Sequence, residues 1–170
     1  MKPLLAFVLA MATTPLLFGQ SVPPSDQKFA EKAAQGGKAE VELGQLAVQK
    51  ASDDKVKQFG QKMVDDHTQA NQKLQQVAEQ EHLTLPTTMD PAAQQEQQRL
   101  SKLSGPEFDK AYMRYQLKDH EKDVAEFKKE AATGKDSGIK NFAQSTLPTL
   151  QEHLKLAQQI APKESMRAAK

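Results

Sequence analysis

Residues 53–81, DDKVKQFGQKMVDDHTQANQKLQQVAEQE, carry the pattern that decides the fold. Small and apolar side chains recur there every three or four residues, which is the spacing of one face of an α-helix. The members of this face are Val56, Phe59, Gly60, Met63, Val64, Ala70, Leu74, Val77 and Ala78. His67 lies at the centre of the same face, where a simple core would have a leucine. An imidazole in this place can take up a proton or bind a metal ion.

Three further stretches have the same periodicity, and each places a polar residue among its apolar ones. They are residues 26–50 with Glu40, residues 107–133 with His120 and residues 138–160 with His153. Residues 92–103 are predicted to form a shorter and mostly polar helix between the second and third long ones. The sequence therefore predicts four long amphipathic helices, each with one polar residue facing inward.

The ends of the long helices carry recognisable signals. Ser25 or Asp26 is the expected N-cap of the first helix, and Ser52 is the expected N-cap of the second. Gly134 is placed to end the third helix. Pro148 falls inside the fourth helix, which it is expected to kink or interrupt.

The lengths of the connections predict the topology. The first two long helices are joined by a few residues, as are the last two, so each pair must run antiparallel. Residues 82–105 form a connection long enough to cross the length of a bundle. Together these features predict an all-α fold, a ferritin-like four-helix bundle with a long crossover carrying a short extra helix.

The first 20 residues differ from the rest of the chain. They begin with a basic residue, continue with an apolar run broken by Pro15, and end in small and polar residues. This is the form of a secretory signal, too short and broken for a typical membrane span; an uncleaved anchor is the alternative. We expect a signal peptide over 1–20 with cleavage near Gly19 or Gln20, a linker over 21–27, the bundle over 28–161 and a flexible tail over 162–170. Export to the periplasm is expected, with outer-membrane association or secretion as alternatives, and no integral membrane span after signal cleavage.

The composition narrows the chemistry. The chain has no cysteine, so disulfides and thiolate metal sites are excluded, and imidazole and carboxylate groups remain. Basic and acidic side chains number 23 and 22, without a basic stripe or an aromatic platform, so nucleic acid is not an expected partner. No nucleophile motif or phosphate-binding loop occurs, so a non-enzymatic role is favoured. A hydrolase that uses metal-bound water and a redox enzyme stay open as alternatives. A protein partner is not identified, and a homo-oligomer is left open.

The polar residues Glu40, His67, His120 and His153 are expected to share one layer of the bundle. In the predicted topology the second and third long helices begin at the same end, and His67 and His120 lie at similar depths in them. The other two fall within one or two turns of that layer. Three imidazoles and one carboxylate would suit one divalent transition metal, zinc or iron in the first place. Asp66 or Asp119 could orient an imidazole from outside the ligand set.

Two interpretations of this layer stay open. A ferritin-type di-iron centre uses Glu-x-x-His on two helices, whereas Val64 and Leu117 stand three residues before His67 and His120. A standard di-iron centre is therefore not expected. Either the four residues bind a metal, or they form a metal-free polar network that fixes helix register. The second interpretation makes the protein a structural or stress-related interaction module.

Three segments carry a resemblance to a known family. They are FAEKAAQGGKAEVELGQLAVQKASDDKVKQFGQKMVDDH, LSGPEFDKAYMRYQLKDH and IKNFAQSTLPTLQEHLKLA. They resemble exported bacterial proteins of the domain-of-unknown-function 4142 family, which are often labelled outer membrane proteins and placed with the ferritin-like superfamily. The resemblance covers about residues 29–160. It implies the same four-helix fold and export, and it implies no established reaction.

Overall fold

The structure is a computed structural model that describes residues 21–162. Its helices are α1 (Pro24–Lys50), α2 (Asp54–Gln80), α3 (Pro91–Ser101), α4 (Gly105–Thr133) and α5 (Ser137–Ile160), and the described residues contain no strand. The predicted all-α class and each predicted helix are confirmed, with ends close to those expected. The expected signal peptide and residues 163–170 of the expected tail lie outside the described residues.

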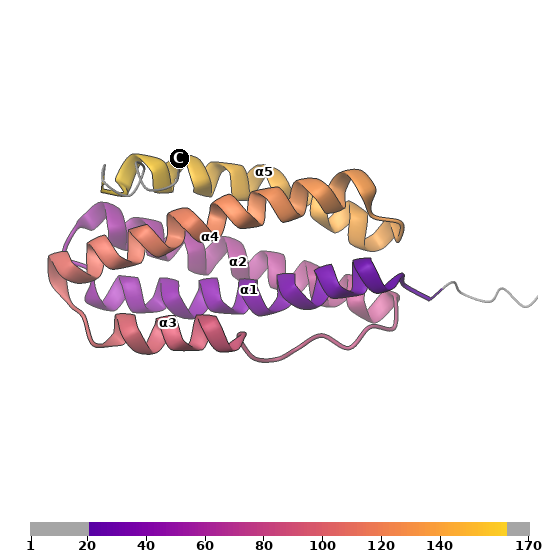
Figure 1. The fold of residues 1–170 in the computed structure, drawn as a ribbon, viewed down its shortest axis with the longest axis horizontal. Helices are drawn as coiled ribbons and strands as arrows, with labels where there is room; N and C mark the ends of the chain where they lie inside the picture. The colour runs from indigo at the N-terminus through magenta and orange to yellow at the C-terminus, as the bar shows by residue number, and fades with distance from the viewer. Residues whose placement is uncertain (1–20, 163–170) are drawn as a thin grey trace, which may run out of the picture.

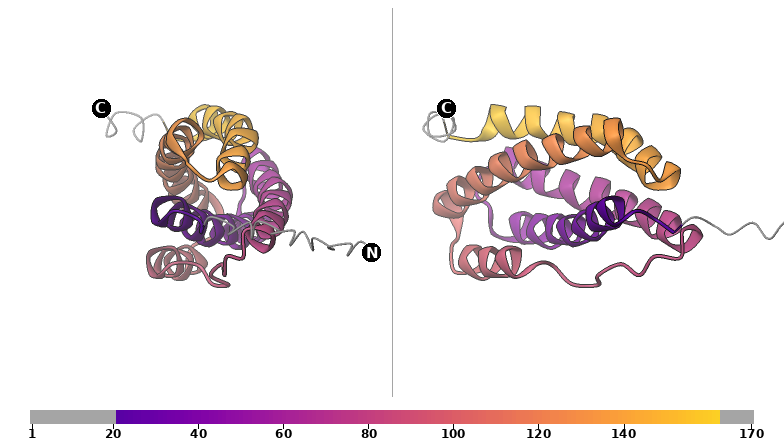
Figure 2. Two further views of the ribbon diagram at one scale, coloured as in Figure 1. Left: turned by 90° about the vertical axis from the view of Figure 1, so that its right-hand side faces the viewer. Right: turned by 45° about the vertical axis from the view of Figure 1, so that its right-hand side comes forward.

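The four long helices run side by side along the long axis of the molecule, as Figure 1 shows. Helix α1 packs mainly on α2 and helix α4 mainly on α5, while α2–α5 and α1–α4 contacts join the two hairpins. The crossover runs back along the bundle, and its helix α3 lies outside the four, against α1 and α4 (Figure 2). This is the expected bundle with one long crossover and a short extra helix.

Side-chain caps explain where three helices begin. Asp53, Asp90 and Asp136 accept hydrogen bonds from the first free N–H groups of α2, α3 and α5. The expectation that Ser52 caps α2 is wrong, because its hydroxyl donates to Asp109 instead, at 2.5 Å. Neither expected cap of α1 is used, since Pro23 is its N-cap residue and makes no side-chain hydrogen bond.

Two signals inside the second half of the chain have different outcomes. Gly134 is the C-cap residue of α4, as expected. Helix α5 continues through Pro148 without a break, and the proline is exposed to solvent. A proline ring on the solvent side removes one backbone hydrogen bond without disturbing the core, so the expected interruption does not occur.

The core is divided by a polar layer. One apolar cluster includes Leu43, Phe59 and Tyr112, and the other includes Phe29, Leu74 and Phe142. The buried polar residues Glu40, His67, Gln116, His120 and His153 belong to neither cluster. The apolar clusters supply most of the stabilisation through buried area, and the polar layer must satisfy its own hydrogen bonds.

Each hairpin turn is held by an aspartate of the other hairpin. Asp109, near the start of α4, accepts hydrogen bonds from the N–H groups of Ser52 and Asp53 between α1 and α2, both at 3.0 Å. Asp26, near the start of α1, accepts hydrogen bonds from the N–H groups of Lys135 and Asp136 between α4 and α5, both at 2.7 Å. We call these two carboxylates the latches. They tie the hairpins together at both ends of the bundle.

Helices α1 and α2 approach each other closely at two glycines. A Cβ atom on Gly44 would lie 2.6 Å from the carbonyl oxygen of Gly60, and one on Gly60 would lie 2.8 Å from the Cβ of Ala47. Both distances are shorter than carbon contacts allow, so these positions need glycine. The cost in helix propensity, about 1 kcal/mol for each glycine, is offset by the close packing it permits.

None of the helices in residues 21–162 is both long enough and apolar enough to cross a membrane.

Candidate metal centre

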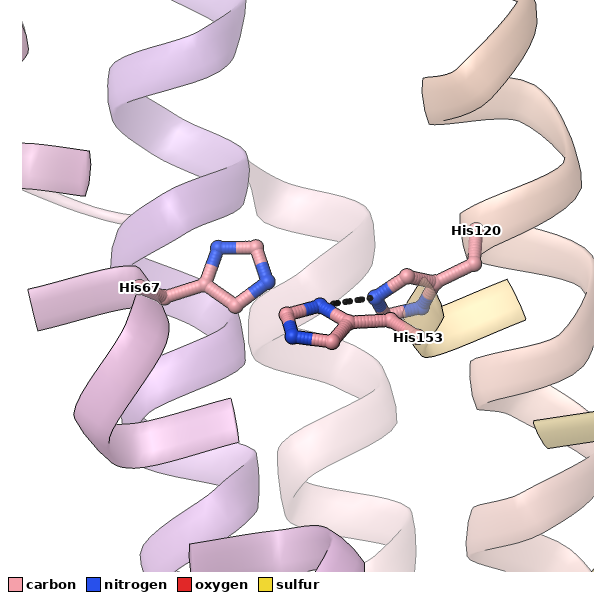
Figure 3. Close-up of side chains that lie close together, drawn as sticks. All are labelled: His67, His120 and His153. Carbon is pink, nitrogen blue, oxygen red and sulfur yellow. Dashed lines mark hydrogen bonds between the residues drawn. The ribbon is translucent and has the colours of Figure 1, made fainter. Parts of the chain in front are cut away.

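The structure brings the three predicted histidines together. His67 comes from α2, His120 from α4 and His153 from α5, and one ring nitrogen from each lies within 4.8 Å of the other two. Figure 3 shows the three imidazoles converging between the helices. His120 and His153 are fully buried and His67 is 5% exposed. The helical periodicity that placed each of them inward also placed them at one level of the bundle.

The hydrogen-bond partner of His120 fixes where its ring proton lies. Its Nδ1 is 3.0 Å from the backbone carbonyl oxygen of Gln116. A carbonyl oxygen can only accept, so Nδ1 carries the proton when the ring is neutral. The Nε2 atom of His120 then presents a bare lone pair, and it points at His153.

His153 is oriented in the same manner by a carboxylate. Its Nε2 lies 2.7 Å from Oδ2 of Asp66, and an ionised carboxylate can only accept. Burial alone would raise the pKa of Asp66, but hydrogen bonds from His153 and Lys62 hold it below its usual value. Neutral His153 therefore carries its proton on Nε2 and presents the lone pair of Nδ1. The expectation that Asp66 or Asp119 orients an imidazole is met by Asp66.

Two lone pairs thus face each other in the centre. Nε2 of His120 and Nδ1 of His153 are 3.3 Å apart. If both rings are neutral, neither of these atoms has a proton to donate. The contact is favourable only when a proton or a metal cation lies between the two nitrogens.

The burial of the rings opposes the proton. Burial lowers the pKa of His120 to about 3, and the nearby His153 adds to the effect. The pKa of His153 is also lowered by burial, although Asp66 partly opposes this. At neutral pH both rings are therefore neutral. The lone pairs at the centre then have no proton to share.

His67 supplies a third nitrogen without a partner. Its Nε2 is buried and makes no hydrogen bond with any described residue. In Figure 3 this ring reaches toward the other two from the opposite side. Burial holds its pKa well below the usual value, and the charges that His120 and His153 could carry lower it further. A buried polar atom without a partner is costly, and a bound cation would satisfy it.

Glu40 is buried in the same layer but is not brought into this group. Its Oε2 accepts a hydrogen bond from Nε2 of Gln116 at 2.8 Å, and its other oxygen has no N–H donor in the described chain. Burial raises the pKa of Glu40 well above its usual value, and the charge of Asp119 raises it further. Burial also raises the pKa of Asp119. Gln116 bridges the two sites, since its side chain binds Glu40 and its carbonyl binds His120.

A cavity of about 500 Å³ lies next to the histidines, and His67 is part of its wall. Its charged wall residues are mostly acidic: Asp90, Glu96, Asp119, Asp123 and Glu126, with Lys32 and Lys122. Burial raises the pKa of Asp123 to about 8, and the charge of Asp119 adds to this. Helix α4 thus contributes His120 to the histidine group and acidic side chains to the neighbouring cavity.

Asp123 and Glu126 were not among the sequence-predicted site residues. A signal for them exists, because Asp119, Asp123 and Glu126 are spaced by four and three residues and so share one face of α4. That face is not apolar, and a charged helix face usually meets solvent. Only the packing of α3 over this side of the bundle shows that it borders a cavity.

A family comparison identifies the chain. The profile of a family described as a domain of unknown function, DUF4142, matches residues 13–160. The chain belongs to the DUF4142 family. This confirms the resemblance found in its sequence, and it leaves the function of this DUF4142 protein open. No curated protein matches its sequence.

Solved structures share the fold of this DUF4142 protein. A DUF305 fragment from Deinococcus radiodurans has a TM-score of 0.72 at 11% identity and covers 83% of this chain and 97% of its own. A DUF305 protein from Streptomyces coelicolor has a TM-score of 0.66 at 16% identity and covers 78% of this chain and 88% of its own. CopM in a Cu(I)-bound form has a TM-score of 0.65 at 14% identity and covers 79% of this chain and 93% of its own. At these identities the likeness extends to the fold alone.

Proposed function

We propose that this protein binds one transition-metal ion through His67, His120 and His153. The observation that carries the proposal is the convergence of three buried ring nitrogens, two of which have their lone pairs turned inward by Gln116 and Asp66. Histidine ligands in metal sites usually donate their other N–H to a carbonyl or a carboxylate. His120 and His153 each have such a partner.

The spacing of two of the nitrogens supports the proposal. Two nitrogens bound to one ion at about 2.0–2.1 Å in a tetrahedral arrangement lie about 3.3–3.4 Å apart. The separation between Nε2 of His120 and Nδ1 of His153 is 3.3 Å. The distance between these two nitrogens thus suits a shared ion, and His67, whose ring nitrogen lies within 4.8 Å of theirs, would complete the set from the facing helix after a small inward shift.

The ligand set suits several transition metals. Imidazole binds copper, zinc, iron and nickel, and zinc and iron are the candidates that the sequence raised. Three histidines hold a doubly charged zinc ion in some enzymes. Copper(I) is added as a candidate by the shared fold of CopM. CopM, which shares the fold, has been solved with Cu(I) and with Ag bound, so Ag(I) is a suitable redox-stable probe.

Metal binding is tested on protein purified without an affinity tag or chelator. We expect one equivalent of Ag(I) or Cu(I) by elemental analysis and calorimetry, and a rise in thermal stability of about 3 kcal/mol at a hundredfold excess over the dissociation constant. His120→Leu should weaken binding at least about 100-fold, since removing even a group outside the ligand set costs about 10–100-fold. His82→Asn is the matched control, because His82 is exposed on the crossover at a φ of 55°, which asparagine tolerates. Absence of stoichiometric metal and of any thermal shift with copper, silver, zinc, iron or manganese would contradict the proposal.

The metal-free alternative has one observation in its favour. With a single proton between them, His120 and His153 would form a hydrogen bond at the observed 3.3 Å, and the cluster would serve only to fix helix register. In that case the double variant His67→Leu with His120→Leu keeps or raises stability, and the wild type binds no metal. The binding measurement above distinguishes the two functions.

Export is part of the proposal, and it rests on the signal-like form of residues 1–20. A metal-binding bundle without cysteine suits an oxidising compartment such as the periplasm. The mass of the protein isolated from the native host's periplasmic fraction should correspond to a chain starting near residue 20 or 21. A chain that keeps residues 1–20 in that fraction would contradict cleavage.

A further inference from the structure

The cavity beside His67 has the architecture of an access route. Side chains of α1 and α4 form its sides, α3 and the residue before it form its outer edge, and residues of α2 and α5 form its floor. Lys32 and Lys122 on its wall are exposed to solvent, whereas His67 and Leu150 on the same wall are buried. The cavity therefore connects the surface with the level of the histidines. His120 and His153 are not part of its wall, so His67 is the ligand reached first.

The wall of this route changes character with depth. Asp90, Glu96 and Glu126 are partly exposed at its outer part, and ionised carboxylates there attract cations. Asp119 and Asp123 are partly exposed on the same wall. Carboxylate oxygens bind hydrated cations through few contacts, while imidazole nitrogens hold copper and zinc more specifically. The order of groups thus runs from weak collection to firm binding.

A second observation, independent of the acidic residues, marks the inner end. His67 is 5% exposed, forms part of the cavity wall, and has an Nε2 atom without a hydrogen-bond partner. His67 thus lines the acidic passage and has a buried nitrogen that a bound cation would satisfy.

We propose that the acidic cavity between α1 and α4, under α3, is a cation-collecting site through which metal ions reach His67 and the other two histidines. This inference rests on the proposed metal-binding function. It assigns to Glu96 and Glu126 a role in the rate of metal uptake rather than in the final affinity. The collected ion is a hydrated metal cation, which exchanges water for carboxylate oxygens and then for imidazole nitrogens.

The test is stopped-flow uptake of Ag(I), supplied as silver nitrate in chloride-free buffer at low ionic strength. The signal is tyrosine emission. The chain contains two tyrosines and no tryptophan, and one of the tyrosines, Tyr115, lies on the cavity wall. The double variant Glu96→Gln with Glu126→Gln should take up Ag(I) about 10-fold more slowly, as expected when charge no longer concentrates the cation. Its equilibrium affinity should stay within about threefold of the wild type, and added salt should reduce the difference in rate.

The matched control is Glu107→Gln with Glu121→Gln. Both residues are exposed on α4 and outside the cavity wall, and the pair removes the same charge. Its uptake rate should stay within about twofold of the wild type. A third variant, Gly36→Leu, narrows the route without changing charge, since a Cβ on this wall residue meets nothing within 4 Å. It should also slow uptake.

Three outcomes would overturn the inference. The cavity and control variants could take up Ag(I) at the same rate, which removes the role of the acidic wall. The cavity variant could instead bind with unchanged uptake and faster release, which makes the carboxylates part of the final site. If the wild type binds no Ag(I) at equilibrium, the proposed function itself fails, and that measurement is made first.

Discussion

The two hairpins of the bundle follow one plan and differ in what they place inside. Each hairpin begins with a latch aspartate, Asp26 or Asp109, and an aspartate caps its second helix, Asp53 or Asp136. The number of residues from Asp26 to Asp109 equals the number from Asp53 to Asp136. The α1–α2 hairpin brings its helices together through glycines, while aromatic rings pack in the α4–α5 hairpin, where Phe127 and Phe142 are 5.9 Å apart.

This difference determines how the metal centre is built. Two of its rings, His120 and His153, come from the α4–α5 hairpin. Gly37 precedes His120 by the same number of residues as Asp26 precedes Asp109, so Gly37 is the counterpart of His120 in α1. The space that a side chain would need at Gly37 is filled by Asn71. The first hairpin therefore contributes only His67 to the three-histidine group. The centre is complete only when the hairpins are docked.

Removal of a latch, which breaks the contact between the two hairpins, should lower the free energy of unfolding most. Asp109→Ala and Asp26→Ala should each lower the free energy of unfolding by about 3 kcal/mol or more, because hydrogen bonds to charged groups contribute about 1.5–3 kcal/mol each. Each of these aspartates accepts from two backbone N–H groups and one hydroxyl. Urea unfolding followed by circular dichroism measures both. Asp53→Ala is the control, since it removes a cap within one hairpin and should cost about 1 kcal/mol. Latch variants that lose no more than this control would show that the hairpins are held by apolar packing alone.

Substitution of a glycine sharpens the contrast in helix spacing. Gly44→Ala should destabilise the protein by about 1–3 kcal/mol, because the added Cβ would lie 2.6 Å from a backbone oxygen of α2 that cannot move easily. Gly36→Ala is the matched control in the same helix, where nothing lies within 4 Å, and should stabilise by up to about 1 kcal/mol through helix propensity. Thermal unfolding of the pair checks the sign of each change. Equal effects at the two positions would mean that α1 and α2 can separate without cost.

The change in the free energy of unfolding with each pH unit is the smallest of the expected effects. The pKa of His120 is lowered to about 3 in the folded chain from an ordinary 6.5. Between these values the unfolded chain binds a proton that the folded chain does not, so stability present above pH 6.5 is lost as the pH falls. The slope from this one ring is about 1.4 kcal/mol per pH unit. Asp123, whose pKa is raised to about 8, acts in the opposite sense and removes stability as the pH rises toward that value.

These two terms are separated by two variants in metal-free buffer with a chelator. Relative to wild type, His120→Leu should flatten the fall in stability from pH 6 to pH 4 by about 1.4 kcal/mol per unit. Asp123→Asn should remove the fall between pH 6 and pH 8. Unfolding free energies measured across this range decide both. An unchanged profile in His120→Leu would show that the ring is protonated in the folded chain.

The fold could be predicted from the sequence because it depends on local patterns. Apolar periodicity set the four long helices, and short or long connections set which helices are neighbours. The inward direction of the histidines followed from the same periodicity. These features are properties of single helices or of adjacent ones. Asp66 was one of two aspartates expected to orient an imidazole, and its pairing with His153 of the other hairpin follows from no local pattern.

The remaining features depend on contacts between residues far apart in the chain. Glu40 was expected among the ligands, but the pairing of its carboxyl with Gln116 depends on the rotation of α1 against α4, which periodicity does not determine. Ser52 carries an ordinary N-cap signal, yet its hydroxyl is taken by Asp109 from the other hairpin. The acidic cavity likewise exists only because α3 covers one face of α4.

The latches make the turns dependent on each other. The N–H groups of Ser52 and Asp53 bond to Asp109, and those of Lys135 and Asp136 bond to Asp26, so neither turn is protected by its own hairpin. Exchange of these four amide hydrogens with deuterium in the solvent should therefore report the separation of the two halves rather than local fraying. The same separation would dismantle the histidine centre, so a bound metal ion should slow the exchange of all four amides together.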